Sequence, residues 1–418
     1  MANILIYIDY SATSNGTGSI ISPYNTISGL PTQQNRTYLL KSGTTITDDL
    51  GPLLNGDGNV IGAYGTGEKP IIDRSLPITN MTYNNTYDIY EKALGTGAFG
   101  HVTEDGIPLK AIYWNAVNDI ATVAPLMTAG TFAFDNTNQI VYVKPSSGSI
   151  DDHSYRYASG LYCIRTTNSN SNLKILDLDI TGASRHGIAL FNKKGLLISN
   201  IGGGKIGGYW EGTRAAYIGN GIEISAGCLG AQIVDCVQED VWDSCFTTQL
   251  YEASPATVYG HEYRNVVANR FGLAGVEISN PTASTYQTIR DIYVTNATIT
   301  NGSSSFWMNK PSGDAVSAVS TLSNGVTNRV DGVVFNHITA SNVGRLWSTS
   351  NTQGKNVLMN ATGDGVYQYG LRKVHAGGGL ATATDTVVNC VLTNSAANSE
   401  AGGTFTFQDY FRQVRTII

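Results

Sequence analysis

Two short stretches of the sequence carry a glutamate in the same setting. "GNGIEIS" contains Glu223, and "LAGVEIS", some fifty residues later, contains Glu277. Apolar residues flank each glutamate, which predicts a β-strand whose apolar side chains point to one face and whose glutamate points to the other. Two carboxyl groups beside one groove can work as a general acid and a general base, the pair that glycosidic hydrolysis requires.

The elements that must position these glutamates recur along the chain. From about Leu173 the sequence consists of short β-branched runs separated by Asn, Gly or Asp, such as "LKILDLDITGASRHGIALFN" and "EYRNVVANRFGLAGVEISNP". The unit is about twenty residues long and carries two strand-like runs without a helix-length apolar stripe. This pattern predicts an all-β fold, a right-handed parallel β-helix in which each coil buries its apolar face against its neighbours.

Stacked coils should align their inward-facing residues into rows. One expected row is Ile188, Ile222, Cys245 and Val276, and the next is Leu190, Ile224, Thr247 and Ile278. Glu223, Phe246 and Glu277 would then share one outward column, with the two carboxylates two coils and roughly 9.6 Å apart. Because inverting glycosidases hold their carboxyl groups about 6.5–9.5 Å apart and retaining ones about 5–5.5 Å, this spacing favours inversion. The alternative is that both glutamates are ordinary solvent-facing residues of half-exposed strands.

A second column is expected at the turn that leads into these strands, formed by His186, Asn220 and Asp243. Asp243 could supply a third carboxylate one coil from both glutamates, and His186 could transfer a proton near neutral pH. Asn220 has a simpler interpretation as a member of an asparagine ladder along a turn.

A long Gly-rich loop, residues 202–220, leads directly into Glu223, and long loops are often functional. The expected substrate contacts in and near it are Tyr209, Trp210, Glu211, Trp242 and Tyr251, with Tyr217 as a further aromatic. Glu211 is also a candidate acid, and the aromatic rings either stack on sugars or plug the edge of a coil. Glu252, His261 and Glu262 are weaker candidates for the rim of the same groove.

The opening "IYIDYSATSNGTGSIISPYNTI", followed by "YLLKSGTTI" and "VIGAYGTGEKPIID", resembles the N-terminal coils of the pectin-lyase-like right-handed β-helix superfamily. "YIGNGIEIS" and "VWDSCFTTQ" are similar to its central coils, so the resemblance spans most of the chain. The superfamily includes bacterial polysaccharide-degrading enzymes and phage tailspikes. The resemblance therefore implies a fold and a carbohydrate ligand rather than one reaction.

Four regions are expected. Residues 1–76 would hold the N-terminal cap and first coils, 77–157 an inserted β-rich module, 158–312 the central coils with the groove, and 313–418 the last coils with a cap or assembly element. In the insert, "GTFAFDNTNQIVYVKP" predicts a hairpin around "DNTN". Such a module resembles one that some carbohydrate-active β-helix proteins carry between their first coils.

Composition excludes several classes of function. The net charge of −6 and pI near 5.5, without a Lys/Arg run, argue against a nucleic-acid partner. No apolar stretch approaches the roughly 18 residues of a spanning helix, so membrane insertion is not expected. "GTGAFG" matches a dinucleotide fingerprint without the following helix pattern, and no cofactor is expected. Five cysteines without a CxxC pair, at positions 163, 228, 236, 245 and 390, predict buried free thiols and no metal site.

Three classes of function remain open. The first is a hydrolase of a bacterial surface polysaccharide such as a capsule, O-antigen or exopolysaccharide. The second is a polysaccharide lyase, whose β-elimination needs a base, with Lys205, Arg214 and Arg270 as candidates. The third is a noncatalytic receptor-binding protein that uses the groove as a lectin would.

The start "MANILIYIDY" lacks a conventional secretory signal, and the C-terminal "GGTFTFQDYFRQVRTII" is apolar enough to need a cover. Both features favour a phage tailspike that assembles as a homotrimer on the virion tail. The alternative is a secreted bacterial enzyme that acts as a monomer.

Overall fold

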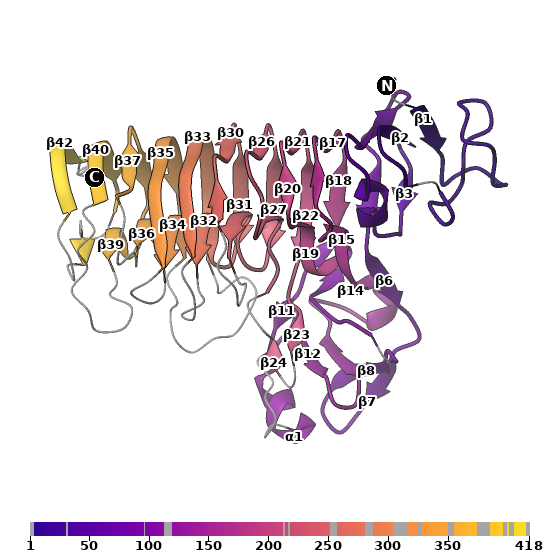
Figure 1. Ribbon diagram of the computed structural model, residues 1–418. Coiled ribbons are helices and arrows are strands. Elements are labelled where there is room, and N and C mark those ends of the chain that lie inside the picture. Colours follow the sequence, from indigo (N-terminus) through magenta and orange to yellow (C-terminus); the bar gives the residue numbers. More distant parts are fainter. Residues whose placement is uncertain are drawn as a thin grey trace.

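A computed structural model describes residues 4–414 with the exception of 31, 96, 113–118, 212–213, 216–217, 251–256, 281–286, 304–315, 324–327, 350–354, 374–384, 396–398 and 401–404. Parallel strands from successive coils stack along one axis, and a second lobe hangs from the side near the N-terminal end (Figure 1). Connections between parallel strands of this kind are almost always right-handed. The predicted right-handed parallel β-helix with an inserted β module is confirmed.

The sheet that matters for function contains nine parallel strands in the described residues. They are β15 (Gly160–Thr166), β19 (Ala183–Leu190), β25 (Ile222–Ile224), β28 (Phe246–Gln249), β32 (Ala274–Asn280), β34 (Ser317–Ser323), β36 (Arg345–Thr349), β39 (Tyr369–Lys373) and β41 (Ser399–Glu400). Each strand belongs to a different coil, so residues at the same level of neighbouring strands form columns that run along the axis.

Apart from β16 (Asn170–Ser171) and β20 (Lys193–Lys194), which form a separate pair, most of the remaining strands of the coils belong to a second, large sheet. Its strands are β1 (Ile4–Ile8), β2 (Arg36–Lys41), β3 (Thr45–Ile46), β4 (Val60–Tyr64), β5 (Ile71–Asp73), β17 (Lys174–Leu176), β18 (Asp179–Thr181), β21 (Leu197–Ser199), β22 (Gly202–Ile206), β26 (Gln232–Val234), β27 (Val237–Val241), β29 (Thr257–Tyr259), β30 (Glu262–Arg264), β31 (Val267–Phe271), β33 (Thr288–Gly302), β35 (Arg329–Ser341), β37 (Val357–Met359), β38 (Thr362–Asp364), β40 (Asp385–Thr393) and β42 (Phe405–Val414). Because β42 pairs with β40 in parallel, the coil pattern continues through the C-terminal region, where a cap was also expected.

Rows of apolar side chains fill the interior, as predicted, but the register of one strand differs from the expectation. The observed rows are Ile188, Ile222, Phe246 and Val276, and then Leu190, Ile224, Thr248 and Ile278. The predicted rows contain Cys245 and Thr247, one residue before the Phe246 and Thr248 that the structure places there. The physical reason is that Cys245 and Phe246 are both buried, because the chain bends at Cys245 before β28 begins, so strict alternation fails there.

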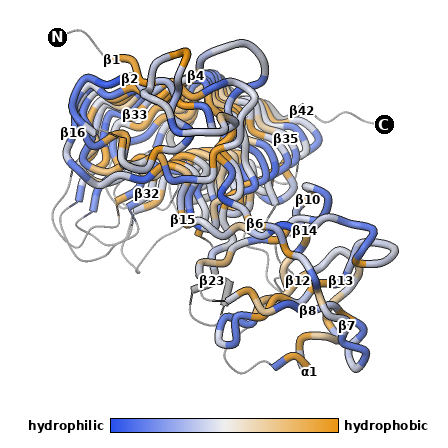
Figure 2. The backbone as a smooth tube through the Cα atoms, turned by 90° about the vertical axis from the view of Figure 1, so that its right-hand side faces the viewer, coloured by the Kyte–Doolittle hydropathy of each residue, from blue (hydrophilic) through white to orange (hydrophobic). Residues whose placement is uncertain are grey.

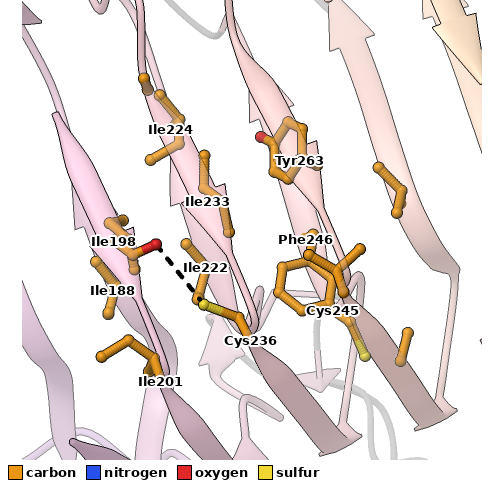
Figure 3. Close-up of a cluster of buried hydrophobic side chains, with 14 of the residues drawn as sticks. Ile188, Ile198, Ile201, Ile222, Ile224, Ile233, Cys236, Cys245, Phe246 and Tyr263 are labelled. Atoms are coloured by element: carbon orange, nitrogen blue, oxygen red, sulfur yellow. Dashed lines mark hydrogen bonds between the residues drawn. The ribbon is translucent and has the colours of Figure 1, made fainter. Parts of the chain in front are cut away.

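Buried free thiols were predicted, and all five cysteines are free and buried. Cys236 and Cys245 pack among the isoleucines of the interior, beside Phe246 and Tyr263 (Figure 3). The Cys236 thiol also lies 3.9 Å from the backbone carbonyl oxygen of Ile198 on the preceding coil. These side chains therefore act as small apolar core residues.

An asparagine ladder runs along one turn of the coils. Asn265 donates from its amide to Asp235 at 2.8 Å, and Asn296 donates to Asn265 at 3.2 Å. All three residues have φ near +55°, a left-handed conformation that Asn and Asp tolerate better than other side chains. Asp235 and Asn265 lie between strands of the large sheet and Asn296 lies within β33, so the ladder is away from the nine-stranded sheet.

The inserted module forms the second lobe, seen beside the superposed coils when the stack is viewed along its axis (Figure 2). Its elements are β6 (Ser75–Ile78), β7 (Thr82–Asn84), β8 (Ile89–Ala93), β9 (Val102–Glu104), β10 (Ile107–Pro108), β11 (Lys110–Ala111), α1 (Ile120–Val123), β12 (Thr131–Asp135), β13 (Ile140–Lys144) and β14 (Tyr155–Ala158). The hairpin predicted around "DNTN" is confirmed, because β12 and β13 pair in antiparallel fashion. The first and last strands, β6 and β14, also pair with each other and close the module at its base.

Trp242 joins the two lobes. It follows β27 of the β-helix, yet its fully buried ring belongs to the hydrophobic core of the insert. Gly207 and Gly208 lie against Trp242. A Cβ atom at Gly207 would stand 2.6 Å from Cβ of Trp242, and one at Gly208 would stand 2.9 Å from the backbone nitrogen of His101 and 3.1 Å from the Trp242 ring. In the described part of the chain, no helix has the length and apolar character needed to cross a membrane.

Candidate active site

Glu223 and Glu277 share one outward column of the nine-stranded sheet. Glu223 on β25 is level with Thr247 on β28, which is level with Glu277 on β32. The predicted shared column is therefore confirmed, with one coil between the glutamates, which stand two coil steps apart. The residue between them is Thr247, and Phe246 points into the core because of the register of β28.

Neither glutamate is solvent-facing. Glu223 is 4% exposed and Glu277 is 2% exposed. The Glu277 carboxylate accepts hydrogen bonds from the Ser244 hydroxyl at 2.7 Å and from the Gln249 amide at 3.3 Å. The Glu223 carboxylate accepts from the Asn220 amide at 3.0 Å. Burying a carboxyl group costs free energy unless the group is paired or hydrogen-bonded. The two glutamates are therefore not ordinary solvent-facing residues of half-exposed strands.

Two side-chain amides connect the glutamates, an arrangement we call the amide bridge. Nδ2 of Asn220 donates both to Glu223 and to Oε1 of Gln249, the latter at 3.3 Å, while Nε2 of Gln249 donates to Glu277. Oδ1 of Asn220 accepts the backbone N–H of Ser244 at 3.3 Å, which fixes the orientation of this amide. Asn220 is therefore not part of an asparagine ladder along a turn, because its side chain hydrogen-bonds Glu223, Gln249 and the backbone of Ser244.

Asp243 lies beside the two glutamates, and 6% of its surface is exposed. Ser244, rather than Asp243, is level with Asn220, because β28 starts one residue later than expected. Oδ1 of Asp243 is buried without a hydrogen-bond partner in the described part of the chain. Burial raises the pKa of Asp243 well above its usual value, and the nearby charges of Glu277 and Glu223 raise it further. Asp243 therefore holds a proton at pH values where an ordinary aspartate is ionised.

The pKa of Glu277 is also raised, mainly by burial, although its hydrogen bonds from Ser244 and Gln249 oppose the shift. Like charges at close range disfavour ionisation of both groups. Asp243 and Glu277 thus behave as a coupled pair in which at least one carboxyl group tends to stay neutral.

His186 completes the polar group. Its Nδ1 accepts the backbone N–H of Asn220 at 3.0 Å and lies 3.3 Å from Oε2 of Glu223. Burial lowers the pKa of His186, and the charge of Glu223 only partly compensates. In the neutral ring the proton is consequently on Nε2, where it can be donated to a ligand.

A cavity of about 450 Å³ opens beside these groups. One wall of the cavity carries the titratable side chains of His186, Glu223 and Asp243, together with Asn220 and Gln249 of the amide bridge. Its other wall is formed by Tyr162, Arg165, Arg185 and Phe191. Glu277 is outside this lining, so it acts on the cavity through Asp243 and the amide bridge.

The expected substrate contacts divide into three groups. Tyr209 is half-buried, with its ring 5.9 Å from the guanidinium carbon of Arg185 at the cavity wall. Trp242 offers no face to a ligand, because its ring is enclosed by the insert. The side chains of Trp210 and Glu211, and all of Tyr217, Tyr251 and Glu252, lie outside the described residues.

The weaker candidates lie away from the cavity. His261 is inside the β-helix, with Nδ1 3.2 Å from the Thr248 hydroxyl and Nε2 3.2 Å from the Cys228 carbonyl oxygen. Glu262 is on β30 of the large sheet. Of the predicted bases, Arg270 pairs with Asp240 at 2.6 Å on that same sheet, and Lys205 lies on β22. The side chain of Arg214 is not described.

Sequence reasoning missed six residues of the site: Tyr162, Arg165, Arg185, Phe191, Ser244 and Gln249. Arg165 could have been predicted from the alignment of neighbouring strands. Arg165 is paired with Ala189, and Ala189 is paired with Glu223, so aligning "LYCIRTT" with "GIALFN" places the arginine in the glutamate column.

Comparisons with known proteins concern the fold alone. No family model matches the chain, and no curated protein matches it either. A solved structure of XylC in complex with xylose aligns with 96% of this chain and 71% of its own, at 8% identity and a TM-score of 0.60. A hyperthermoactive exopolygalacturonase from Thermotoga maritima aligns with 92% of this chain and 80% of its own, at 9% identity and a TM-score of 0.50. What the chain shares with these two proteins is the parallel β-helix fold.

Proposed function

We propose that the protein is a glycoside hydrolase that cleaves a bacterial surface polysaccharide. The observation that carries this proposal is the position of Asp243, buried beside Glu223 on the wall of one cavity, where burial and the neighbouring carboxylates raise its pKa. The combination supplies a general acid and a general base, the two groups that glycosidic hydrolysis uses. A xylose complex and an exopolygalacturonase among the structural neighbours agree with a carbohydrate ligand.

In the proposed reaction, Asp243 donates its proton to the glycosidic oxygen as the bond from that oxygen to the anomeric carbon breaks. Glu223 takes a proton from a water molecule, whose oxygen forms the new bond to the anomeric carbon. Glu277 keeps Asp243 protonated through its charge, and the amide bridge holds both glutamates in place. The Nε2–H of His186 donates to a sugar hydroxyl.

Inversion at the anomeric carbon is the stereochemical outcome of this single displacement, because the water molecule attacks the face of the sugar opposite to the leaving oxygen. Proton NMR of the first product formed tests this directly, because the two anomers of the new reducing end have different signals.

A lyase reaction is the second candidate. It is favoured by one observation, the presence of Arg165, Arg185 and a neutral His186 in the same cavity. β-Elimination needs a base and a cation that neutralises a uronate. It leaves an unsaturated sugar that absorbs ultraviolet light, and the product mass is short of one water.

The test is incubation of the protein with capsule, O-antigen and exopolysaccharide panels, followed by chain-length and mass analysis. Hydrolysis predicts products that have gained one water, with activity lost in Asp243→Asn and in Glu223→Gln. Glu262→Gln is a matched control, because Glu262 lies on the other sheet. Full activity in both site variants would show that the site is wrongly assigned, and binding without cleavage would support the receptor-binding alternative.

The phage tailspike and the homotrimer stay predictions from the sequence. Light scattering in dilute solution tests the assembly. A mass near 44.5 kDa, that of one chain, would contradict the trimer and favour a secreted monomeric enzyme.

A further inference from the structure

Arg165 stands in the same outward column as the glutamates. It is level with Ala189 on β19, which is level with Glu223 on β25. At about 4.8 Å per coil, the backbones of Arg165 and Glu223 are roughly 9.6 Å apart along the axis. The cavity therefore runs from the carboxyl groups toward the N-terminal coils and ends at a guanidinium group.

Aromatic rings hold the two arginines of the cavity. The guanidinium carbon of Arg165 lies 4.9 Å from the ring centre of Tyr162 and 5.9 Å from that of Phe191. The guanidinium carbon of Arg185 lies 5.9 Å from the ring centre of Tyr209. A guanidinium group that contacts rings through its flat faces keeps its N–H donors, which lie in its plane, available for a ligand.

In the part of the chain that the structure describes, neither guanidinium group forms an ion pair with a carboxylate, and Arg165 contacts Asp49 through its backbone N–H, at 3.1 Å. Arg156, Arg270 and Arg329 each pair with an aspartate, at 3.0, 2.6 and 2.6 Å. By contrast, Nε of Arg185 is buried without a hydrogen-bond partner among the described residues. The charges of Arg185 and Arg165 both act on His186 and lower its pKa, which places them at the site. A buried donor left without an acceptor costs free energy, and an anionic ligand would remove that cost.

We propose that this end of the cavity is a subsite for an acidic sugar, whose carboxylate binds Arg165 and Arg185. The inference rests on the proposed function and names its substrate class, a glycan that contains uronic acid. A planar carboxylate matches the two parallel N–H donors of a guanidinium group, and the rings of Tyr162 and Phe191 flank the position of the sugar. The scissile bond would lie next to this sugar unit in the direction of the C-terminal coils, beside Glu223 and Asp243.

Single sugars test the subsite without any cleavage. The probes are glucuronate and galacturonate, with glucose and galactose as the matched neutral sugars, and binding is measured by isothermal titration calorimetry and saturation-transfer NMR. We expect both the loss of the carboxylate and the change Arg165→Met or Arg185→Met to weaken binding by about tenfold or more. Arg264→Met, on the opposite sheet and paired with Glu262, should change nothing.

The outcomes separate the two proposals. Equal binding of acidic and neutral sugars, no uronate binding, or unchanged binding in both arginine variants would overturn the subsite. A galactose sulfate that binds more tightly than galacturonate would also overturn it, in favour of a sulfated sugar. If uronates bind as expected and no polysaccharide is hydrolysed, the subsite stands and the proposed function fails. Arg165→Lys, which keeps the charge and loses the planar fork, provides a milder variant should Arg165→Met fail to fold.

Discussion

Asp243 and Glu277 lie on neighbouring coils, both buried, and the charge of Glu277 raises the pKa of Asp243. A folded protein that buries two interacting carboxyl groups loses stability as the pH rises, because both groups are ionised in the unfolded chain. Such a cost is typical of a site arranged for chemistry rather than for stability.

Asp243→Asn should therefore abolish activity and stabilise the protein. Because the folded pKa of Asp243 is raised above 3.8, its contribution to stability is present below that pH and is lost as the pH rises toward the folded pKa. Asparagine removes this loss, so the melting temperature near neutral pH should rise while the rate falls by about 10²- to 10⁴-fold. Calorimetry and a rate assay check this, and a lower melting temperature at neutral pH would contradict the assignment of a neutral Asp243.

Gln249→Ala should break the amide bridge. Its amide connects Asn220 to Glu277, so removal leaves buried polar groups without partners and costs about 1–3 kcal/mol of unfolding free energy. The rate should fall more than the affinity for substrate, because the glutamates lose their orientation. Gln232→Ala on β26, an exposed glutamine near Glu262, is the control. A kcat equal to that of the wild type would show that the bridge has no role in catalysis.

His261 should make the fold sensitive to acid. Its Nε2–H donates to the Cys228 carbonyl oxygen and its Nδ1 accepts from Thr248, an arrangement that needs a neutral ring. Burial lowers its pKa to about 4, below the value of 6.5 in an unfolded chain. The unfolded state thus binds more protons in this window, and stability is lost as the pH falls from 6.5 toward 4.

The measurement is the change in melting temperature between neutral and mildly acidic buffer. His261→Gln should reduce that change, and His337→Gln should leave it as in the wild type, because His337 is exposed. His101, which is also buried with a pKa lowered to about 4, should retain part of the acid sensitivity in the His261 variant.

Trp242→Ala should loosen the insert from the β-helix. The ring is fully buried among residues of the insert, so its loss should cost about 3–5 kcal/mol, and Trp242→Phe should cost less. Limited proteolysis that cleaves the insert before the coils would check the location of the damage. If the melting temperature of the alanine variant is unchanged, the ring does not hold the two lobes together.

Much of the fold could be predicted because apolar alternation and turn residues repeat along the chain. Glu223 and Glu277 could be assigned to one column since Ile222, Ile224, Val276 and Ile278 define the inward face on both strands. The predicted register of β28 is wrong by one residue. "CF" places two apolar side chains in succession, and alternation does not decide which of them faces the core.

The rest of the site depends on contacts between coils. Asn220 and Gln249 are separated by 29 residues, and no local pattern shows that their amides meet. Trp242 flanks the strand in "DSCFTTQ", which predicts a contact with substrate, but a residue beside a strand end can turn toward either lobe. The distinction depends on how the insert docks, and a sequence pattern does not contain that information.

Stacked coils also restrict how such a site can change. A coil added or removed between Glu223 and Glu277 would alter their spacing by about 4.8 Å in one step, and no smaller adjustment along the axis is open to the backbone. A coil added between β28 and β32 would move Glu277 out of reach of Ser244 and Gln249, whose side chains donate to it, and of Asp243, whose pKa its charge raises. Descendants of this chain would therefore keep or lose the influence of Glu277 on the site together with a whole repeat, without intermediate geometries.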